Sequence, residues 1–261
     1  MRVSRPISRP LSHPLTHSLG GLGVALDPLQ SLITSLFNSN EQGAIYIPRP
    51  VVLGAQALFQ DSAGTVPVTS DGDPVGRELD QSGNGNHATQ SVSGSRPVFP
   101  GLVYDGIDDF MSFNNVELNG AMMIAAAVNY NASPGISMFL GSASVENKIG
   151  TTNGKWFARV AGSATALVGP AITTGTPQIV TIVRDASNIV TMRVNGVFVA
   201  SNTQEGQGDF NQTAGSNISS SPQAQPVRGK LNGLIIVAGV VSLSNIEAVE
   251  SYLAEQAGVT L

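Results

Sequence analysis

Apolar and polar residues alternate in short runs through most of the chain, which is the period expected of β-strands. Residues 178–184 and 189–194 are rich in β-branched side chains, which fit a pleated sheet. Residues 121–128 form an apolar run of small side chains, typical of a strand buried on both faces. The run at 189–194 meets Asn195 and Gly196, a pair that favours positive φ and predicts a two-residue β-hairpin. The pattern therefore indicates a domain made mainly of strands.

Near the C-terminus the pattern changes from a strand to a helix. Residues 231–240 predict a late core strand. Ser244 and Glu247 then have the spacing of a capping box, which satisfies backbone N–H groups at the start of a helix. Gly258 ends the predicted helix, because glycine readily adopts the left-handed conformation found there. The apolar side of this helix consists of Ile246, Val249 and Leu253.

A short helix is also predicted near the N-terminus. Asp27 can cap it, and Pro28 suits the first helical position. Its apolar stripe, at positions i, i+3, i+4, i+7 and i+8, is formed by Leu29, Leu32, Ile33, Leu36 and Phe37. A helix of about ten residues is marginal alone in water. The stripe must therefore dock on its own domain, on a second copy of the chain or on another protein.

Residues 4–19 form a four-residue repeat that begins Ser-Arg-Pro-Ile and Ser-Arg-Pro-Leu. Proline fixes φ, removes a backbone donor and biases the preceding residue toward extended backbone, so the repeat predicts an extended, polyproline-like arm. The arm is either a solvated tail or an anchor in the groove of a partner, and its regularly spaced apolar and basic residues favour the anchor. Together with the helical stripe, the predicted partner-binding residues are Arg5, Ile7, Arg9, Leu11, Leu15 and Leu19.

Two turn clusters stand in the middle of the chain, at residues 80–89 (DQSGNGNHAT) and 104–111 (YDGIDDFM). Both pack Gly, Asn and Asp between short apolar runs, which suits sharp corners between strands. Their sequence resembles the opening of concanavalin A-like (laminin-G-like) jelly-roll domains. The resemblance implies an all-β fold: a jelly-roll β-sandwich over residues 43–261 with a C-terminal helix, preceded by an anchoring arm and short helix over residues 1–42.

The segments at 41–46, 58–69 and 72–76, which lead into the first turn cluster, look like those of tailed-bacteriophage and prophage structural proteins. The resemblance covers about residues 1–115 closely, and the remainder only as a jelly roll. It implies a non-enzymatic virion protein, assembled in the host cytoplasm, whose partners are other virion proteins and copies of itself. It would display its sandwich in a tail, fibre or host-attachment role. The alternatives are a capsid decoration protein and a carbohydrate-binding module that recognises host surface glycans.

Composition excludes several other classes. The formal net charge of −5 argues against general nucleic-acid binding, which needs a basic footprint. No apolar run approaches the roughly 18 residues needed to span a bilayer, so no membrane insertion is expected. The chain has no cysteine, and therefore no disulfide framework and no thiolate site. The Arg-rich N-terminus also fits a transit peptide, but Pro6, Pro10 and Pro14 oppose the amphipathic helix that such a peptide needs.

Catalytic chemistry is not expected. The acidic string of jelly-roll glucanases is missing, and in a strand Asp108 and Asp109 would point to opposite faces. The three histidines, two in the arm and His87 in the first turn cluster, match no recognisable catalytic or metal motif. Trp156, the single tryptophan, could stack on a sugar ring but fits the core better.

No cofactor is expected, apart from a possible structural calcium ion. Calcium takes hard oxygen ligands from loops, and the chain offers several aspartates in loops. The candidate ligands are Asp71, Asp73, Asp105, Asp108 and Asp109. Their spacing matches no known calcium loop, and Asp is also a routine turn residue.

Overall fold

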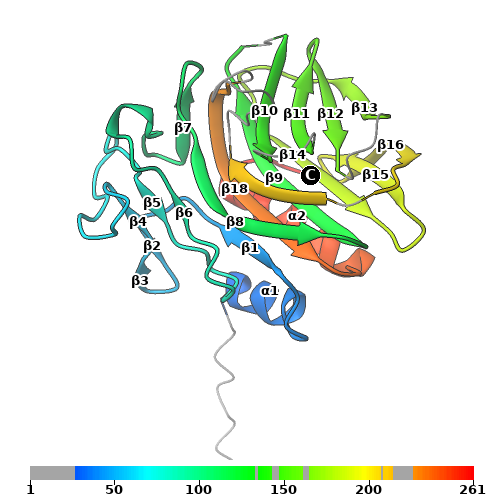
Figure 1. Ribbon diagram of the computed structural model, residues 1–261, viewed down its shortest axis with the longest axis horizontal. Helices are drawn as coiled ribbons and strands as arrows, with labels where there is room; N and C mark the ends of the chain where they lie inside the picture. The colour runs from blue at the N-terminus through cyan, green and yellow to red at the C-terminus, as the bar shows by residue number, and fades with distance from the viewer. Residues whose placement is uncertain (1–26, 133–134, 143–146, 161–164, 207, 214–225) are drawn as a thin grey trace, which may run out of the picture.

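The structure is a computed structural model that describes residues 27–132, 135–142, 147–160, 165–206, 208–213 and 226–261. Two large antiparallel sheets face each other across a common apolar core, and one helix lies near each end of the described chain (Figure 1). This architecture confirms the predicted all-β jelly-roll sandwich with a short N-terminal helix and a C-terminal helix.

The first sheet has seven strands, and its central strands are the β-branched and small-residue runs recognised in the sequence. One further strand, β7 (Leu102–Asp105), pairs with β18 outside the main order. The order of the others is β1 (Gly43–Tyr46), β18 (Arg228–Ala238), β9 (Met122–Tyr130), β14 (Gln178–Arg184), β15 (Ile189–Val194) and β16 (Val197–Thr203).

The second sheet has nine strands, and its last three are very short. The order is β13 (Leu167–Ala171), β12 (Lys155–Arg159), β11 (Lys148–Thr152), β10 (Ile136–Gly141), β17 (Gly208–Thr213), β8 (Met111–Leu118), β6 (Ala88–Thr89), β5 (Arg77–Glu78) and β4 (Leu58–Phe59). A separate hairpin joins β2 (Val51–Val52) to β3 (Ala55–Gln56), and Ser93–Ser95 form one 3₁₀ turn.

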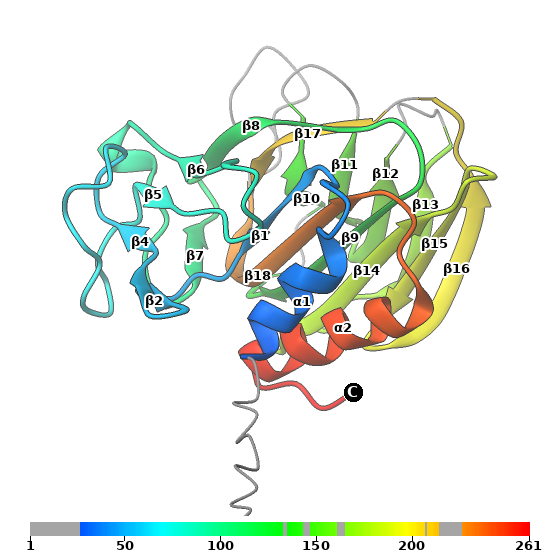
Figure 2. The ribbon, with the colours of Figure 1, turned by 90° about the horizontal axis from the view of Figure 1, so that it is seen from below.

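Both helices, α1 (Pro28–Leu36) and α2 (Leu243–Ala257), lie side by side on the outer face of the seven-stranded sheet (Figure 2). The seven-stranded sheet is therefore buried on both faces. In β9, Ile124 belongs to the core between the sheets, whereas Met123 and Ala125 belong to the core beneath the helices. This two-sided burial confirms the interpretation of residues 121–128.

Local signals at the ends of elements were mostly confirmed. Asp27 caps α1, its Oδ1 accepting the Leu29 N–H at 2.8 Å. Asn195 and Gly196 both have positive φ, 48° and 78°, as the predicted hairpin requires. The predicted capping box at the start of α2 is wrong by two residues, because the cap is Ser242, whose Oγ accepts the Asn245 N–H. The helix ends at Gly258 with φ 68°, as predicted.

Candidate functional site

The predicted partner-binding residues fall into two groups with different outcomes. Arg5, Ile7, Arg9, Leu11, Leu15 and Leu19 lie outside the described residues, so their contacts stay a prediction. The helical stripe is described, and it lies inside the domain. The 1–42 and 43–261 division also stays a prediction, although α1 packs on the sandwich that follows it.

The stripe of α1 contacts the protein's own core rather than a partner. Leu29, Leu32 and Leu36 are buried beneath the helices, and Ile33 and Phe37 pack partly buried against the same cluster. The prediction that this stripe binds a partner is therefore wrong, and docking on its own domain is observed. The physical reason is that the outward face of the seven-stranded sheet is apolar and must itself be covered.

The first turn cluster is organised around a buried carboxylate. Asp80 accepts hydrogen bonds from the backbone N–H of Ile45, Ser82 and Asn86 at 2.8–3.0 Å, and from the Ser82 hydroxyl at 2.8 Å. His87 Nδ1 accepts the Asp80 N–H at 3.1 Å, so this ring bonds a backbone donor. The polar groups of the turn bind its own backbone and the start of β1. The cluster therefore has a structural role, because its hydrogen bonds hold the turn to the start of β1.

Next to the first turn cluster, Glu78 on β5 is buried, and neither of its carboxylate oxygens has a hydrogen-bond partner. Burial and the nearby charge of Asp80 raise the pKa of Glu78 to about 8. Tyr46 donates its hydroxyl to the Asn86 carbonyl, and burial with the charges of Asp80 and Glu78 raises its pKa well above the ordinary value. Since Glu78 is 1% exposed, a substrate has no direct access to it.

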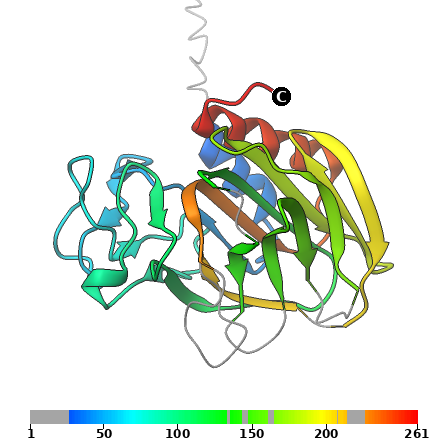
Figure 3. The same ribbon diagram turned by 90° about the horizontal axis from the view of Figure 1, so that it is seen from above.

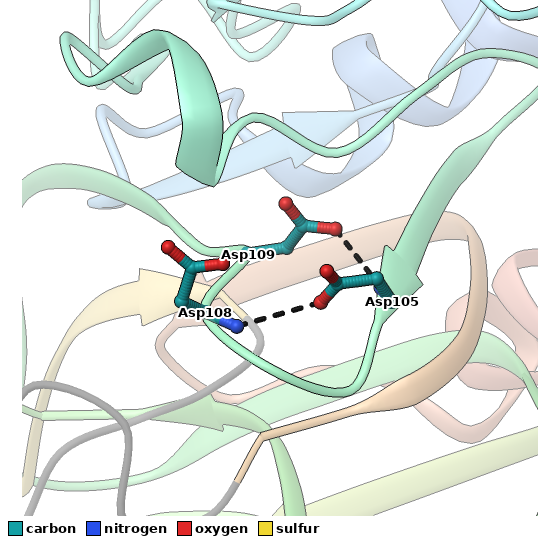
Figure 4. Close-up of side chains that lie close together, drawn as sticks. All are labelled: Asp105, Asp108 and Asp109. Atoms are coloured by element: carbon teal, nitrogen blue, oxygen red, sulfur yellow. Dashed lines mark hydrogen bonds between the residues drawn. The ribbon is translucent and has the colours of Figure 1, made fainter.

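The second turn cluster brings three carboxylates together between β7 and β8 (Figure 4). Ligand atoms of Asp105, Asp108 and Asp109 all lie within 4.8 Å of one another. The expectation that Asp108 and Asp109 point to opposite faces of a strand is wrong, because both lie in the turn before β8 begins. This geometry gathers three of the five predicted calcium ligands; Asp71 and Asp73 are not part of the group.

Hydrogen bonds within the turn account for much of this convergence. Asp105 Oδ1 accepts the Ile107 N–H at 2.7 Å, and Asp109 Oδ2 accepts the Asp105 N–H at 2.9 Å. The Ser95 hydroxyl donates to Asp108 Oδ2 at 2.6 Å. Burial, together with the charges of Asp105 and Asp108, raises the pKa of Asp109 to about 6, against the lowering effect of its backbone hydrogen bond. Calcium binding by this acidic turn stays a prediction.

A third feature, on β11 and β12, was missed in the sequence. Trp156 is buried in the core with its ring edge-on to Tyr130, which confirms the core interpretation. Because successive side chains alternate across a strand, its neighbour Phe157 points to the outer face of the nine-stranded sheet. Lys148 Nζ and Arg159 Cζ each lie 5.8 Å from the centre of the Phe157 ring.

We name this feature the Phe157 face, and it comprises Phe157, Lys148, Lys155 and Arg159. The alternation in Lys-Trp-Phe-Ala-Arg over residues 155–159 was a usable signal for it. The sequence alone did not show which face of the sheet is covered by helices. Both helices lie across the seven-stranded sheet from β10, β11 and β12 (Figure 3), so no helix of the described chain covers the Phe157 face.

No protein-family model matches this chain, and no curated protein matches it. Solved structures do match. A Trypanosoma rangeli sialidase in complex with 2,3-difluoro-KDN is 14% identical with a TM-score of 0.55, covering 90% of this chain and 39% of its own. The binding domain of Paraclostridial Mosquitocidal Protein 1 is 14% identical with a TM-score of 0.50, covering 71% and 52%. The chain therefore spans between a third and about half of these relatives.

A smaller domain also matches: the CBM40 of Ruminococcus gnavus IT-sialidase bound to alpha2,3 sialyllactose, 17% identical, with a TM-score of 0.41, over 50% of this chain and 82% of that one. At such identities the comparisons show the fold alone. That fold is a jelly-roll β-sandwich. No helix of the described residues is long and apolar enough to cross a membrane.

Proposed function

We propose that this chain is a non-enzymatic structural component of a tailed-phage particle, attached through its N-terminal arm and displaying a lectin-like β-sandwich. The observation that carries the proposal is the docking of α1, which fixes the exit point of the arm on one face of the domain. Asp27, the first described residue, caps α1, and α1 lies on the outer face of the seven-stranded sheet. The Phe157 face lies on the opposite sheet.

This two-sidedness suits a protein attached at one face and exposed at the other. Ordering sixteen extended residues costs roughly 1–2 kcal/mol each, which only a partner surface can offset. Burial of the apolar side chains of the repeat would return about 1.5–3 kcal/mol apiece. The resemblance of residues 1–115 to phage structural proteins supports a particle as that partner.

The described acidic residues support a non-enzymatic role. Glu78 is buried without access, and the acidic turn holds its carboxylates through hydrogen bonds to its own backbone and to Ser95. Glu250 is paired with Arg193. None of these groups combines exposure with a partner poised for proton transfer, which general acid–base catalysis requires.

A second candidate function is glycan binding by the same displayed sandwich, and the Phe157 face favours it. The ring of Phe157 is half-buried on the sheet surface, and its accessible part offers a small flat apolar surface of the kind that packs against a sugar. Attachment and glycan binding are compatible, because they use opposite faces.

The experiment that tests attachment is a deletion of residues 1–26. The deletion stops before Asp27 because α1 belongs to the core, and its removal would expose the apolar face of the sheet. The shortened protein should keep the circular dichroism spectrum and melting temperature of the full chain. When the shortened protein is supplied in place of the full chain, it should be absent from the purified particles.

A matched control keeps the length of the arm and changes its side chains. In this variant Ile7, Leu11, Leu15 and Leu19 are all replaced by Ser. Loss of this protein from particles would assign attachment to the apolar repeat. Normal incorporation of the 1–26 deletion would refute the anchor.

A further inference from the structure

We propose that the groove between α1 and α2 binds one four-residue repeat from the N-terminal arm of a second copy of this chain. The inference rests on the proposed function and deepens it, because it names the partner that the arm would bind. The groove belongs to the described domain, and the repeats lie in residues 4–19 of the neighbouring copy.

The groove lies where the two helices run side by side (Figure 2). It has a volume of about 500 Å³ and a mostly apolar surface. Leu32 is buried and Tyr252 is half-buried, so these two large side chains form its floor. The residues that border the floor are all small, which keeps the space between the helices open; they are Ser31, Ser35, Ala248 and Ser251.

The length of the groove matches one repeat of the arm. Pro28 and Ser35 mark its two ends on α1, and seven helical steps of about 1.5 Å extend over about 10 Å. A polyproline-like segment rises about 3.1 Å per residue, so one four-residue repeat extends over about 12 Å. One groove therefore accommodates one repeat and not the whole arm.

The apolar chemistry of the groove also suits the repeat. Polyproline segments dock in grooves lined by aromatic side chains, because their preformed conformation loses little entropy on binding. Tyr252 supplies the aromatic ring of the groove. In the first two repeats, Pro6 with Ile7 and Pro10 with Leu11 supply the apolar side chains that would cover it.

Two acidic residues stand at one end of the groove. Asn245 Nδ2 donates to the Ser35 carbonyl at 3.5 Å, which places the end of α1 beside the start of α2. The helices are therefore antiparallel, and Asp27 at the start of α1 and Glu255 near the end of α2 lie at the same end of the groove. Both residues are exposed.

The charges of groove and arm are complementary. Burial raises the pKa of Tyr252 to about 12, and the charges of Asp27 and Glu255 add to this rise while that of Arg49 opposes it. Two carboxylates and one cation thus lie near the ring, which leaves this end net negative. Residues 1–26 contain three arginines and no Asp or Glu. An arginine that precedes a proline in the repeat would therefore meet an acidic end.

The geometry of the repeat favours a second copy over the arm's own domain. A polyproline helix has three residues per turn, so a four-residue repeat turns its apolar residue by a third of a turn at each step. Ile7, Leu11 and Leu15 would therefore face three directions, of which one domain can use only one. Residues 12–26 can extend over about 47 Å, against a radius of gyration of about 17 Å for a domain of this size. The repeat at residues 8–11 can thus reach a neighbour.

Disulfide trapping tests the contact directly, because the chain has no cysteine of its own. A full chain with Ser12→Cys in the arm is mixed with a full chain with Ser251→Cys in the groove, and the mixture is oxidised. Only a contact between copies can join these two chains. The mixed disulfide should form severalfold more than with Ser244→Cys, a matched exposed serine on α2 outside the groove.

Sedimentation velocity of the full chain measures the strength of the contact. Self-association should increase with protein concentration and weaken with salt, because exposed charges are screened. Ser31→Trp fills the groove and should weaken association about tenfold, whereas Thr34→Trp, exposed on the same helix outside the groove, should leave it unchanged. Each variant is first checked for an unchanged melting temperature, and Ala248→Gln replaces Ser31→Trp if the latter is destabilised.

A charge exchange identifies the segment that the groove binds. Glu255→Lys should weaken association severalfold, because it places a cation where the arm brings its arginines. Arg5→Glu with Arg9→Glu in the same chain should restore part of the loss. Glu247→Lys, also exposed on α2 but outside the groove, is the matched control and should have no effect.

Three outcomes would overturn the inference. They are no self-association and no mixed disulfide from the folded chains, equal trapping by Ser251→Cys and Ser244→Cys, or trapping only within a single chain that carries both Ser12→Cys and Ser251→Cys. The last outcome would place the arm in its own groove. Failure of the attachment proposal looks different, since it is measured by incorporation of the 1–26 deletion into particles. If that deletion is excluded from particles while the full chain does not self-associate, the arm attaches to another partner and this inference is wrong.

Discussion

Two buried glutamates are equally hidden from solvent but differ in their hydrogen-bond partners. Glu250 on α2 and Glu78 on β5 are each 1% exposed. Glu250 accepts two hydrogen bonds from Arg193, at 2.8 Å and 3.0 Å, whereas neither carboxylate oxygen of Glu78 has a partner. The hydrogen bonds of Glu250, together with its charge, in turn raise the pKa of Arg193.

The difference shows that burial alone does not determine the state of a carboxyl group. In the ion pair, the cation and its hydrogen bonds replace the water that burial removes from the carboxylate. An unpaired one is favoured in its neutral form, which is why the pKa of Glu78 rises to about 8. The helix-covered side therefore holds an ion pair, and the side of the first turn cluster holds a protonated acid near neutral pH.

The largest effect is expected from Glu78→Gln. The native pKa of about 8 exceeds the ordinary value of 4.5, so the native state binds a proton that the unfolded state has released. The contribution of Glu78 to stability should therefore be fully present below pH 4.5 and be lost as pH rises toward 8, by an upper bound of roughly 5 kcal/mol at 1.36 kcal/mol per pKa unit. Urea unfolding between pH 5 and pH 9 should show that the free energy of unfolding of the variant increases relative to that of the wild type as pH rises. A difference in stability between the variant and the wild type that does not change with pH would contradict a protonated Glu78 in the native protein.

Breaking the ion pair should have the opposite sign. Glu250→Gln leaves the Arg193 guanidinium without its carboxylate partner and should destabilise the protein by roughly 3 kcal/mol at neutral pH. Glu247→Gln, on the exposed side of the same helix, is the matched control and should be nearly neutral. If the two variants unfold at the same urea concentration, the ion pair between Arg193 and Glu250 does not contribute to stability.

The hairpin beside the ion pair gives a smaller effect. Arg193 Nη2 also donates to the Gly196 carbonyl at 2.6 Å, so the turn and the pair are connected. Gly196→Val should cost about 1–3 kcal/mol, because a β-branched residue is strained at φ 78°. Space is not the cause, since the nearest atom to an added Cβ is 3.9 Å away. Gly196→Asn, which tolerates this conformation better, should lose less; equal losses in a melting experiment would point to another cause.

The smallest effect is expected from Asp109→Asn in the acidic turn. Its pKa is raised to about 6 from the ordinary 3.8, so its contribution to stability should decline between about pH 4 and 6. The rise in pKa at Asp109 is smaller than that at Glu78, so the change in stability should be smaller too. The asparagine oxygen can still accept the Asp105 N–H. Melting curves at pH 4 and 7 should show a modest gain for the variant at pH 7 only; a loss there would mean that a cation or another charge pairs with Asp109.

Local chemistry predicted much of the fold because it acts over a few residues. The Asn195-Gly196 turn, the Asp27 cap and the Gly258 end each depend on neighbours in sequence. The cap of α2 was misplaced because Ser242 and Ser244 both offer a hydroxyl just before the helix, and only the fold decides which one is used.

Long-range features could not be predicted in this way. Asp80 bonds the Ile45 N–H across 35 residues, and Arg193 pairs with Glu250 across 57. The surface against which α1 packs could not be predicted for the same reason, because an apolar stripe predicts that the helix is buried but not which surface covers it. The Phe157 face needed both the strand alternation and the position of the helices, and the sequence supplied only the first.

The docked helix α1 also has a mechanical consequence. A force on the arm enters the domain at Asp27 and acts first on α1, which is held by its packing against α2 and the sheet. If α1 peels away, the load passes to β1, whose pairing with β18 runs from Gly43 to Tyr46. The β1–β18 hydrogen bonds would then open one after another from Gly43. Under such a load the junction would have two successive points of resistance, and α1 would be the first of them.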